Sequence, residues 1–400
     1  MRNSRNSKAI DRRSFLGLAA AGLGSAALVR DLDAQTSNSK ARDMLLYVGT
    51  YTSGESKSRG IYIHKFDGAT GRVSPLRVVE GVEEPSFLTI RGRYLFAVNE
   101  TMEFDGLKSG GVSAFEIDRK SGELKFLNKQ PSMGGAPCHI TTSANGKFAL
   151  VANYMGGNVA VLPIGDDGRL GKAIDVEQHS GTGPNKDRQE AAHAHSIILD
   201  SHNKYGFVND LGIDRVMIYE FDKNKGTLTT NAKQPYYSSA SGAGPRHFKF
   251  HPSGKFAFVV NELDMTLTSL AYDAASGGLR AIDTLSTLPA GMSVPSNSCA
   301  DLHVSPSGDH VYASNRGHDS IAVYSVDKVS GKIELVELVS TRGRTPRNFA
   351  IDPSGNYLLA ANQRSNTIVT FAIDRKTGKL TYTGSTTETP TPVCLQFHEL

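Results

Sequence analysis

The stretch from Pro245 to Glu262, PRHFKFHPSGKFAFVVNE, carries a basic and an acidic side chain near its two ends. FKF and FAFVV are typical of two strands, because bulky and β-branched residues dominate them. The HPSG segment between them has the Pro and Gly positions of a tight turn. A hairpin brings the start of its first strand beside the end of its second, so Arg246 and Glu262 are expected at the same end. A guanidinium beside a carboxylate can form a structural ion pair or help to bind an anion.

The same strand-turn-strand unit recurs along the chain. The second strand of each copy ends on a polar residue, at spacings of 54, 57, 51, 54 and 47 residues: Asn99, Asn153, Asp210, Asn261, Asn315 and Asn362. A second hairpin follows in all but one repeat, with an Asp at its turn and a Gly four residues later. Four strands per repeat of about fifty residues, without helical periodicity, are typical of a propeller blade.

The two ends of the chain complement each other. Residues 44–400 divide into seven repeats, since 357/7 is 51. The first copy, LLYVGTY, lacks a hairpin partner, and Pro392–Phe397 resembles the opening strand of the other copies. We therefore predict an all-β, seven-bladed β-propeller with four antiparallel strands per blade and a ring closed by the N- and C-terminal strands. An open linear stack is the alternative, although it would leave strand edges exposed.

Aligning the repeats by their turns predicts two rings of residues at one end of the central channel, which we call the mouth. The first strands begin at Ser86, Cys138, His195, Arg246, Ala300 and Arg347. The second strands are followed by Glu100, Tyr154, Leu211, Glu262, Arg316 and Gln363. Scaffold positions should share apolar residues, whereas these diverge toward His, Arg and Glu, so they could meet around a small ligand. Structural ion pairs between blades are the simpler alternative, but arginines near one axis repel one another unless carboxylates or an anion join them.

Other features of the sequence point less clearly to chemistry. Two long loops, 101–111 and 179–193, attach at the mouth and could wall it. His193 and His195 could place two imidazoles on one strand face for a metal, but no clear set of carboxylate or Cys ligands accompanies them. The chain has no G-x-S-x-G, H-E-x-x-H or P-loop motif.

The first 34 residues have the pattern of an export signal. Arg12-Arg13 precedes Phe15-Leu16 and a short apolar run, and Ala34 lies before a polar stretch. The paired arginines resemble the twin-arginine type, whose pathway exports folded proteins. We therefore predict a signal peptide at 1–34, a disordered leader at 35–43, a propeller domain at 44–400, and a periplasmic or secreted location. An uncleaved anchor or a chance apolar segment is the alternative.

Charge outside this segment is nearly balanced. The chain has 44 Lys+Arg and 40 Asp+Glu, of which residues 1–34 hold six and three, so 38 and 37 remain. This balance argues against a broad nucleic-acid-binding surface. The expected partners are a small-molecule substrate and, for the precursor, the export machinery, with no membrane partner for the mature form.

Several segments together resemble a known family: GPNKDRQEAAHAHSIILD, GPRHFKFHPSGKFAFVVNELD, SNRGHDSIAVYSVD and TPRNFAIDPSGNYLLAANQRSNTI. They are similar to the seven-bladed propeller lactonases, which include bacterial 6-phosphogluconolactonase and fungal carboxy-muconate cyclase, from about Leu45 to Phe397. The active-site residues of the cyclase members fall on His195, Arg246, Glu262 and Arg316. Further residues around the mouth are predicted to contact the substrate: His139, Tyr154, Arg188, Gln189, His193, Arg347 and Gln363.

The resemblance implies a lactone ring opened by water, or closed by the reverse reaction, without a metal or organic cofactor. Glu262 or His195 could be the base, with the other residue orienting it or protonating the leaving alkoxide. Arg246 and Arg316 could stabilise the oxyanion or clamp a substrate carboxylate or phosphate. We therefore predict a lactonase that hydrolyses a sugar-acid or related lactone to the open hydroxy acid.

The predicted export bears on the substrate, because phosphorylated sugar lactones are cytoplasmic metabolites. An unphosphorylated aldonolactone, or another lactone from outside the cell, fits the predicted compartment better. A non-catalytic exported propeller that binds a glycan, peptide or envelope component is the alternative.

Overall fold

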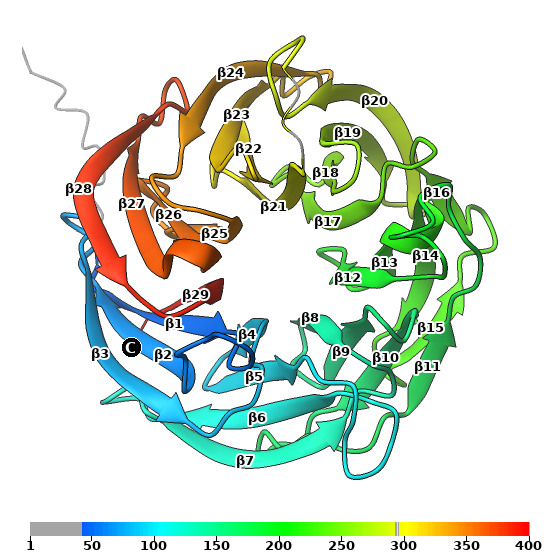
Figure 1. Ribbon diagram of the computed structural model, residues 1–400. Coiled ribbons are helices and arrows are strands. Elements are labelled where there is room, and N and C mark those ends of the chain that lie inside the picture. The colour runs from blue at the N-terminus through cyan, green and yellow to red at the C-terminus, as the bar shows by residue number, and fades with distance from the viewer. Residues whose placement is uncertain (1–41, 293, 295, 400) are drawn as a thin grey trace, which may run out of the picture. The chain divides into compact units, whose positions relative to one another are not determined.

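The computed structural model describes residues 42–292, 294 and 296–399, and the elements below lie within these ranges. The strands form seven antiparallel sheets that stand as blades around a common axis (Figure 1). Six sheets have four strands, and the remaining sheet has a short fifth strand. The predicted all-β, seven-bladed propeller is confirmed.

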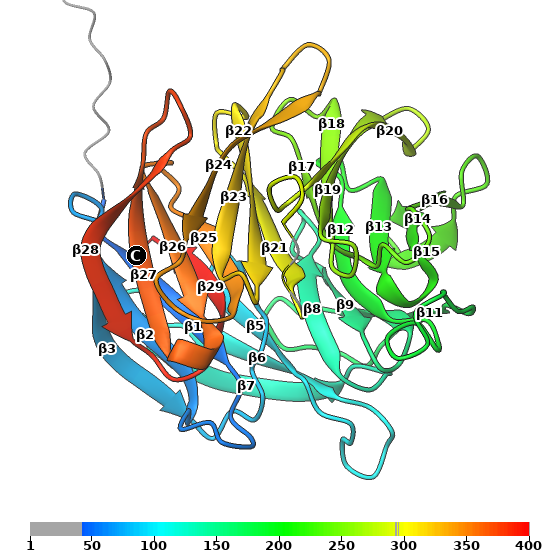
Figure 2. The same ribbon diagram turned by 45° about the horizontal axis from the view of Figure 1, so that its top comes forward.

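The strands of each blade run side by side from the axis outward (Figure 2). Blade 1 contains β29 (Pro392–His398), β1 (Met44–Thr50), β2 (Gly60–Phe66) and β3 (Val73–Glu80). Blade 2 contains β4 (Leu88–Arg91), β5 (Tyr94–Asn99), β6 (Gly111–Ile117) and β7 (Leu124–Pro131). Blade 3 contains β8 (Pro137–Thr142), β9 (Phe148–Asn153), β10 (Asn158–Pro163) and β11 (Asp175–Gln178). Blade 4 contains β12 (Ala194–Leu199), β13 (Tyr205–Asp210), β14 (Arg215–Asp222), β15 (Thr227–Thr230) and β16 (Tyr236–Ser238).

The remaining blades repeat the pattern. Blade 5 contains β17 (Pro245–Phe250), β18 (Phe256–Asn261), β19 (Thr266–Asp273) and β20 (Gly278–Ser286). Blade 6 contains β21 (Ser298–Val304), β22 (His310–Arg316), β23 (Ser320–Val326) and β24 (Ile333–Ser340). Blade 7 contains β25 (Pro346–Ile351), β26 (Tyr357–Asn362), β27 (Thr367–Ile373) and β28 (Leu380–Glu388). Two 3-10 turns, η1 (Leu211–Ile213) and η2 (Gln363–Ser365), follow β13 and β26.

Seven clusters of buried apolar side chains hold the ring together, one at each interface between neighbouring blades. The second strand of a blade serves two interfaces, because alternate side chains of a strand point to opposite faces. In β5, Leu95 and Ala97 pack toward blade 1, whereas Phe96 and Val98 pack toward blade 3. Burial on both faces explains why these strands read as continuous apolar runs in the sequence.

The last strand of the chain completes the first blade. β29 pairs with β1 in an antiparallel register that matches Leu45 with His398 and Val48 with Leu395 (red beside blue in Figure 1). Its Val393, Cys394 and Leu395 are at most 3% exposed. The predicted closure of the ring by the two ends of the chain is confirmed.

The predicted signal peptide at 1–34 lies outside the described residues, as does the leader at 35–43 except for its last two positions. Within the described ranges, no helix is long and apolar enough to cross a bilayer. The export signal and the cleavage of the leader therefore stay predictions.

Candidate active site

β-Bulges shape the mouth where the innermost strands begin. The register shifts by one residue near the start of β8, β12, β17, β21 and β25. A bulge leaves a residue unpaired and re-aims its side chain. Arg246 and His247 therefore line the same small cavity although they are consecutive, as do Arg347 and Asn348.

Glu262 lies just past β18 and is the centre of a cluster of charges. Its Oε2 lies 2.8 Å from Nε of Arg246 and 3.0 Å from an amino nitrogen of Arg316, and its Oε1 accepts a hydrogen bond of 2.6 Å from Arg188. The side chains of Glu262 and Arg246 are 4% and 3% exposed, so this contact is almost fully shielded from water. The mouth thus gathers three guanidiniums around one carboxylate.

These contacts set the charges of Glu262 and Arg246. Burial alone would raise the pKa of the Glu262 carboxyl, but the three guanidiniums outweigh it and hold that pKa well below its usual range. Burial lowers the pKa of Arg246 to about 10, helped by the positive charges of Arg316 and Arg347. Glu262 and Arg246 are therefore both charged at neutral pH, and Glu262 is a weak base because its pKa lies far below that pH.

The cluster retains donors that no protein group uses. The Nε–H of Arg246 lies close to Glu262 but out of line for a hydrogen bond, and the Nε–H of Arg316 also finds no acceptor among the described residues. Both groups are buried. A buried N–H without a partner is costly, so a ligand oxygen at this position would be stabilised by it.

His195 lies in the wall of the same mouth but does not contact Glu262. Its ring packs against Tyr154 and His247, with centroids 5.5 and 5.4 Å away, and its Nδ1 lies 3.7 Å from the Cys138 sulfur. Its Nε2 has no hydrogen-bond partner among the described residues. Burial, with the charge of Arg246 nearby, holds the pKa of His195 well below its usual value, so the ring is neutral at neutral pH.

Sequence reasoning missed a buried carboxylate that joins blades 5, 6 and 7. Asp301 lies 2.7 Å from Nδ1 of His247 and 3.2 Å from Nε2 of His303, and it accepts a hydrogen bond of 2.5 Å from Asn348. Nε2 of His247 in turn lies 3.2 Å from Arg246, which can only donate. Burial and the Arg246 charge lower the pKa of His247 to about 4, so the neutral ring carries its proton on Nδ1 toward Asp301. Asp301 thus orients His247, which contacts Arg246. The only signal in the sequence was that His247 and Asp301 each follow directly after a position where a first strand begins.

A second set of polar groups lines the side of the mouth opposite Glu262. Glu100, just past β5, accepts hydrogen bonds of 3.0 Å from Tyr51 and 2.5 Å from Ser86. The guanidinium of Arg347 stands 5.3 Å from the centre of the Tyr51 ring and has no hydrogen bond or ion pair to a described residue. Burial raises the pKa of the Glu100 carboxyl, and the nearby Arg347 charge offsets this only in part. The sequence placed Glu100 in the ring of mouth residues without assigning it a role.

The predicted substrate contacts separate into two groups. Arg188 and Tyr154 reach the cluster, since Arg188 bonds to Glu262 and lies 3.3 Å from the Tyr154 hydroxyl. Loop 179–193, which carries Arg188, therefore does cover the mouth, whereas loop 101–111 contributes no side chain to these contacts. Arg347 lines the cavity beside Arg246, and Gln363 lines a neighbouring surface pocket that includes Tyr51.

The other predicted contacts support the protein itself. Gln189 is fully buried, and its amide donates to the Leu211 carbonyl and to Asp214 at 2.8 and 2.7 Å, so it holds the loop rather than facing a ligand. His193 stacks on Tyr154, and both of its nitrogens have protein partners. His139 is buried against Phe87, with centroids 4.4 Å apart. Within residues 42–292, 294 and 296–399, no group of three His, Cys, Asp or Glu side chains is arranged to hold a metal.

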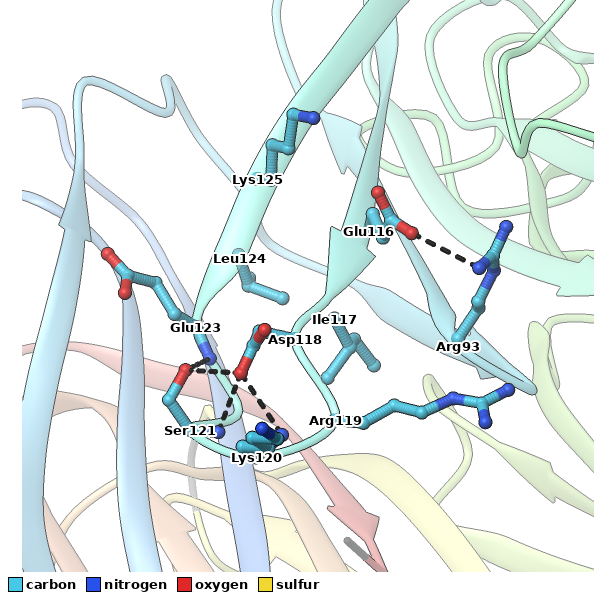
Figure 3. A pocket seen from close by; sticks show the side chains of 10 residues that line it. All are labelled: Arg93, Glu116, Ile117, Asp118, Arg119, Lys120, Ser121, Glu123, Leu124 and Lys125. Atoms are coloured by element: carbon cyan, nitrogen blue, oxygen red, sulfur yellow. Dashed lines mark hydrogen bonds and ion pairs between the residues drawn. The ribbon is translucent and has the colours of Figure 1, made fainter.

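A larger pocket, of about 910 Å³, lies at the far end of blade 2 from Glu100, around the turn between β6 and β7 (Figure 3). Its carboxylates already have partners. Asp118 accepts the backbone N–H groups of Lys120 and Ser121 at 3.0 and 2.8 Å, and Glu116 pairs with Arg93 at 3.4 Å. This pocket therefore reflects the repeated Asp turn of the blades, and the chemistry-bearing cluster lies elsewhere, at the mouth.

The fold and this cluster together define a propeller with buried arginines and carboxylates gathered at the mouth. Residues 45–397 match the family model described as "Lactonase, 7-bladed beta-propeller". The chain belongs to this family, and the prediction that it is an enzyme of the lactonase class is confirmed.

Individual relatives cover nearly the whole ring. The chain is 38% identical to the 6-phosphogluconolactonase of Bacillus subtilis over 353 residues, which are 88% of this chain and 97% of the relative. It is 35% identical to the 6-phosphogluconolactonase of Formosa agariphila over 76% of this chain and 86% of that protein. The solved structure of the periplasmic gluconolactonase of Pseudomonas aeruginosa matches with a TM-score of 0.82 and 34% identity, covering 89% of this chain and 99% of that one. These relatives carry the names of a phosphorylated and an unphosphorylated substrate, so the likeness alone does not choose between them.

Proposed function

We propose that the protein hydrolyses an unphosphorylated sugar-acid lactone to the open hydroxy acid outside the cytoplasm. The observation that carries the proposal is the juxtaposition, at one mouth, of unused guanidinium N–H groups and a neutral imidazole with a free Nε2. The likeness to a periplasmic gluconolactonase supports the substrate class, together with the twin-arginine pattern of the first residues.

In this mechanism His195 is the base. Its imidazole is neutral at neutral pH and its Nε2 is available to take a proton from water as the water attacks the lactone carbonyl. Glu262 is less suited to this step, because both of its carboxylate oxygens are already held by the three arginines. Its role is then to hold Arg246 and Arg316 in place while their Nε–H groups stay free to bind a ligand oxygen.

The arginines supply the positive site for the oxyanion. Attack of water turns the carbonyl oxygen into an alkoxide, and donors that already point to that position stabilise the transition state more than the substrate. Arg246 is fixed from two further sides, since it also donates to the Ala300 carbonyl and contacts His247. An arginine held in this way loses little freedom when the charge develops.

A comparison of two lactones tests this function. The purified mature protein should open D-glucono-1,5-lactone with a kcat/KM at least about tenfold above that for its 6-phosphate, measured by acid release and corrected for spontaneous hydrolysis. His195→Ala should lower kcat by about a hundredfold or more, the scale of a lost general base. His202→Ala, whose side chain is 76% exposed on a turn away from the mouth, is the matched control and should be unaffected.

Two results would contradict the proposal. Higher kcat/KM for the 6-phosphate would assign the phosphorylated substrate instead. Absence of hydrolysis of every lactone tried, with a ligand still bound at the mouth, would favour a non-catalytic binding propeller.

The proposed location outside the cytoplasm has its own test. Arg12→Lys combined with Arg13→Lys should leave the precursor in the cytoplasm, because the twin-arginine pathway reads the paired arginines. Fractionation followed by N-terminal sequencing measures this. Arg2→Lys with Arg5→Lys, which keeps the pair, should still be exported and cleaved. A protein that reached the periplasm equally well in both variants, or still began at Met1 there, would show that this segment is not a cleaved twin-arginine signal.

A further inference from the structure

Two glutamates occupy the same position in their blades but have opposite surroundings. Glu100 and Glu262 are each the first residue after the second strand, in blades 2 and 5. Glu262 is surrounded by three guanidiniums. Glu100 has only the hydroxyls of Tyr51 and Ser86 as hydrogen-bond partners, and no described Lys, Arg or His nitrogen lies within 4.0 Å of its carboxylate.

The two halves of the mouth open into one small space. Glu100 and Ser86 line a cavity from blade 2, Val393 lines it from blade 1, and Arg246 and His247 line it from blade 5. The cavity has room for about one water molecule, or for a single oxygen of a ligand. A carboxyl group and an oxyanion donor therefore face the same position from opposite sides.

The surroundings push the two carboxyls toward different protonation states. The arginines hold the pKa of Glu262 well below its usual range, whereas burial raises the pKa of Glu100. The Tyr51 and Ser86 hydroxyls can accept as well as donate, so they can also bond to a protonated Glu100. Pairs of acids whose environments separate them in this way are typical of sites that use one as a proton donor.

We propose that Glu100 is the general acid of the reaction, and that it protonates the ring oxygen as the lactone opens. This role rests on the lactone hydrolysis proposed above. Water adds its oxygen to the carbonyl carbon and gives a proton to His195. The bond between that carbon and the ring oxygen then breaks, and the ring oxygen takes the proton of Glu100 to become the hydroxyl of the product. The imidazolium returns its proton to Glu100 through solvent, and the new carboxylic acid releases its own proton to the bulk.

The position of Arg347 complements this role. Its guanidinium has no described partner for a hydrogen bond, lines the same cavity as Glu100 and faces the Tyr51 ring. It can hold a hydroxyl or the carbonyl of the substrate while leaving the carboxyl of Glu100 free of a direct ion pair. A direct ion pair would keep Glu100 ionised and unable to donate.

The test compares lactones whose leaving oxygens differ in basicity. Opening of D-glucono-1,5-lactone expels an alkoxide, whereas opening of dihydrocoumarin expels a phenolate, whose conjugate acid has a pKa of about 10 like that of Tyr. A general acid matters much more for the alkoxide. Glu100→Gln should therefore lower kcat for the sugar lactone by about a hundredfold or more, and for the aryl lactone by less than about tenfold.

The pH profile gives an independent readout. A proton donor works only while protonated, so the rate for the sugar lactone should fall as the pH rises through the pKa of Glu100. Glu100→Gln should remove this alkaline limb, because an amide does not titrate. Glu100→Asp, which keeps a titrating carboxyl on a shorter side chain, should lower kcat but retain the limb. Glu103→Gln, an exposed carboxylate three residues along the same loop, is the matched control and should leave both rates and the limb unchanged.

The outcomes separate this role from the proposed function. Wild-type protein that opens neither lactone overturns the function and the role of Glu100 together. If the wild-type protein is active, two results overturn the role alone and leave Glu100 as a positioning residue. One is an equal loss of kcat for both lactones in Glu100→Gln, and the other is an alkaline limb that Glu100→Gln leaves unchanged. If Glu100→Gln fails to fold by its melting curve, loss of the alkaline limb in Glu100→Asp would also overturn it.

Discussion

Glu262→Gln is expected to lower kcat for lactone hydrolysis by about a hundredfold or more. The amide keeps the shape of the side chain but not its charge, so three guanidiniums would share a site without a carboxylate. Arg246 and Arg316 would then move apart, and their N–H groups would no longer converge on the oxyanion. Because breaking a buried ion pair costs about 3–5 kcal/mol, the melting temperature should also fall.

Binding measurements distinguish this anchoring role from that of a base. The uncompensated arginines should bind the carboxylate product more tightly, so the inhibition constant of gluconate should fall while kcat falls. In Glu262→Ala, formate should restore part of the activity by occupying the vacated site. Glu334→Gln, an exposed carboxylate on β24, should change none of these quantities. Activity that survives both Glu262→Gln and His195→Ala would place the chemistry elsewhere.

Removal of residues 390–400 should lower the melting temperature by at least about 10 °C. The truncation deletes β29 and leaves β1 without its inner neighbour. It also removes the buried side chains Val393 and Leu395, each of which contributes about 1.5–3 kcal/mol, and several ladder hydrogen bonds of about 1 kcal/mol each. A loss on this scale is a large part of a typical stability of about 5–15 kcal/mol.

Thermal unfolding followed by circular dichroism measures this effect. A protein that stops after His398 is the matched control, because it keeps the whole of β29 and, among the side-chain contacts of the described residues, loses only the exposed ion pair between Arg42 and Glu399. Its melting temperature should stay within about 2 °C of the full-length value, as surface pairs contribute little. An unchanged melting temperature in the longer truncation would mean that the ring does not depend on its closing strand.

The sequence alone determined the architecture and the end of the blades at which the charged side chains gather. Repeats of one hairpin define their own boundaries, and strands buried on both faces have an unmistakable apolar pattern. The geometry of a hairpin then decides which residues lie at the same end. For this reason Arg246, Glu262 and Arg316 could be placed together at the mouth before any contact was known. The unpaired strand at each end of the chain likewise predicted the closure of blade 1.

Only the tertiary structure decided which of these residues touch. The bulges at the start of the inner strands direct the side chains of consecutive residues, such as Arg246 and His247, toward the same cavity. A bulge has no reliable signature in a single sequence. The path of loop 179–193 is set by long-range hydrogen bonds, so the sequence could not show that Arg188 reaches Glu262 while Gln189 only supports the loop. Protonation depends on burial and on charges from several blades at once. The opposite surroundings of Glu100 and Glu262 therefore appear only when the ring is closed, because each blade contributes one side of the site.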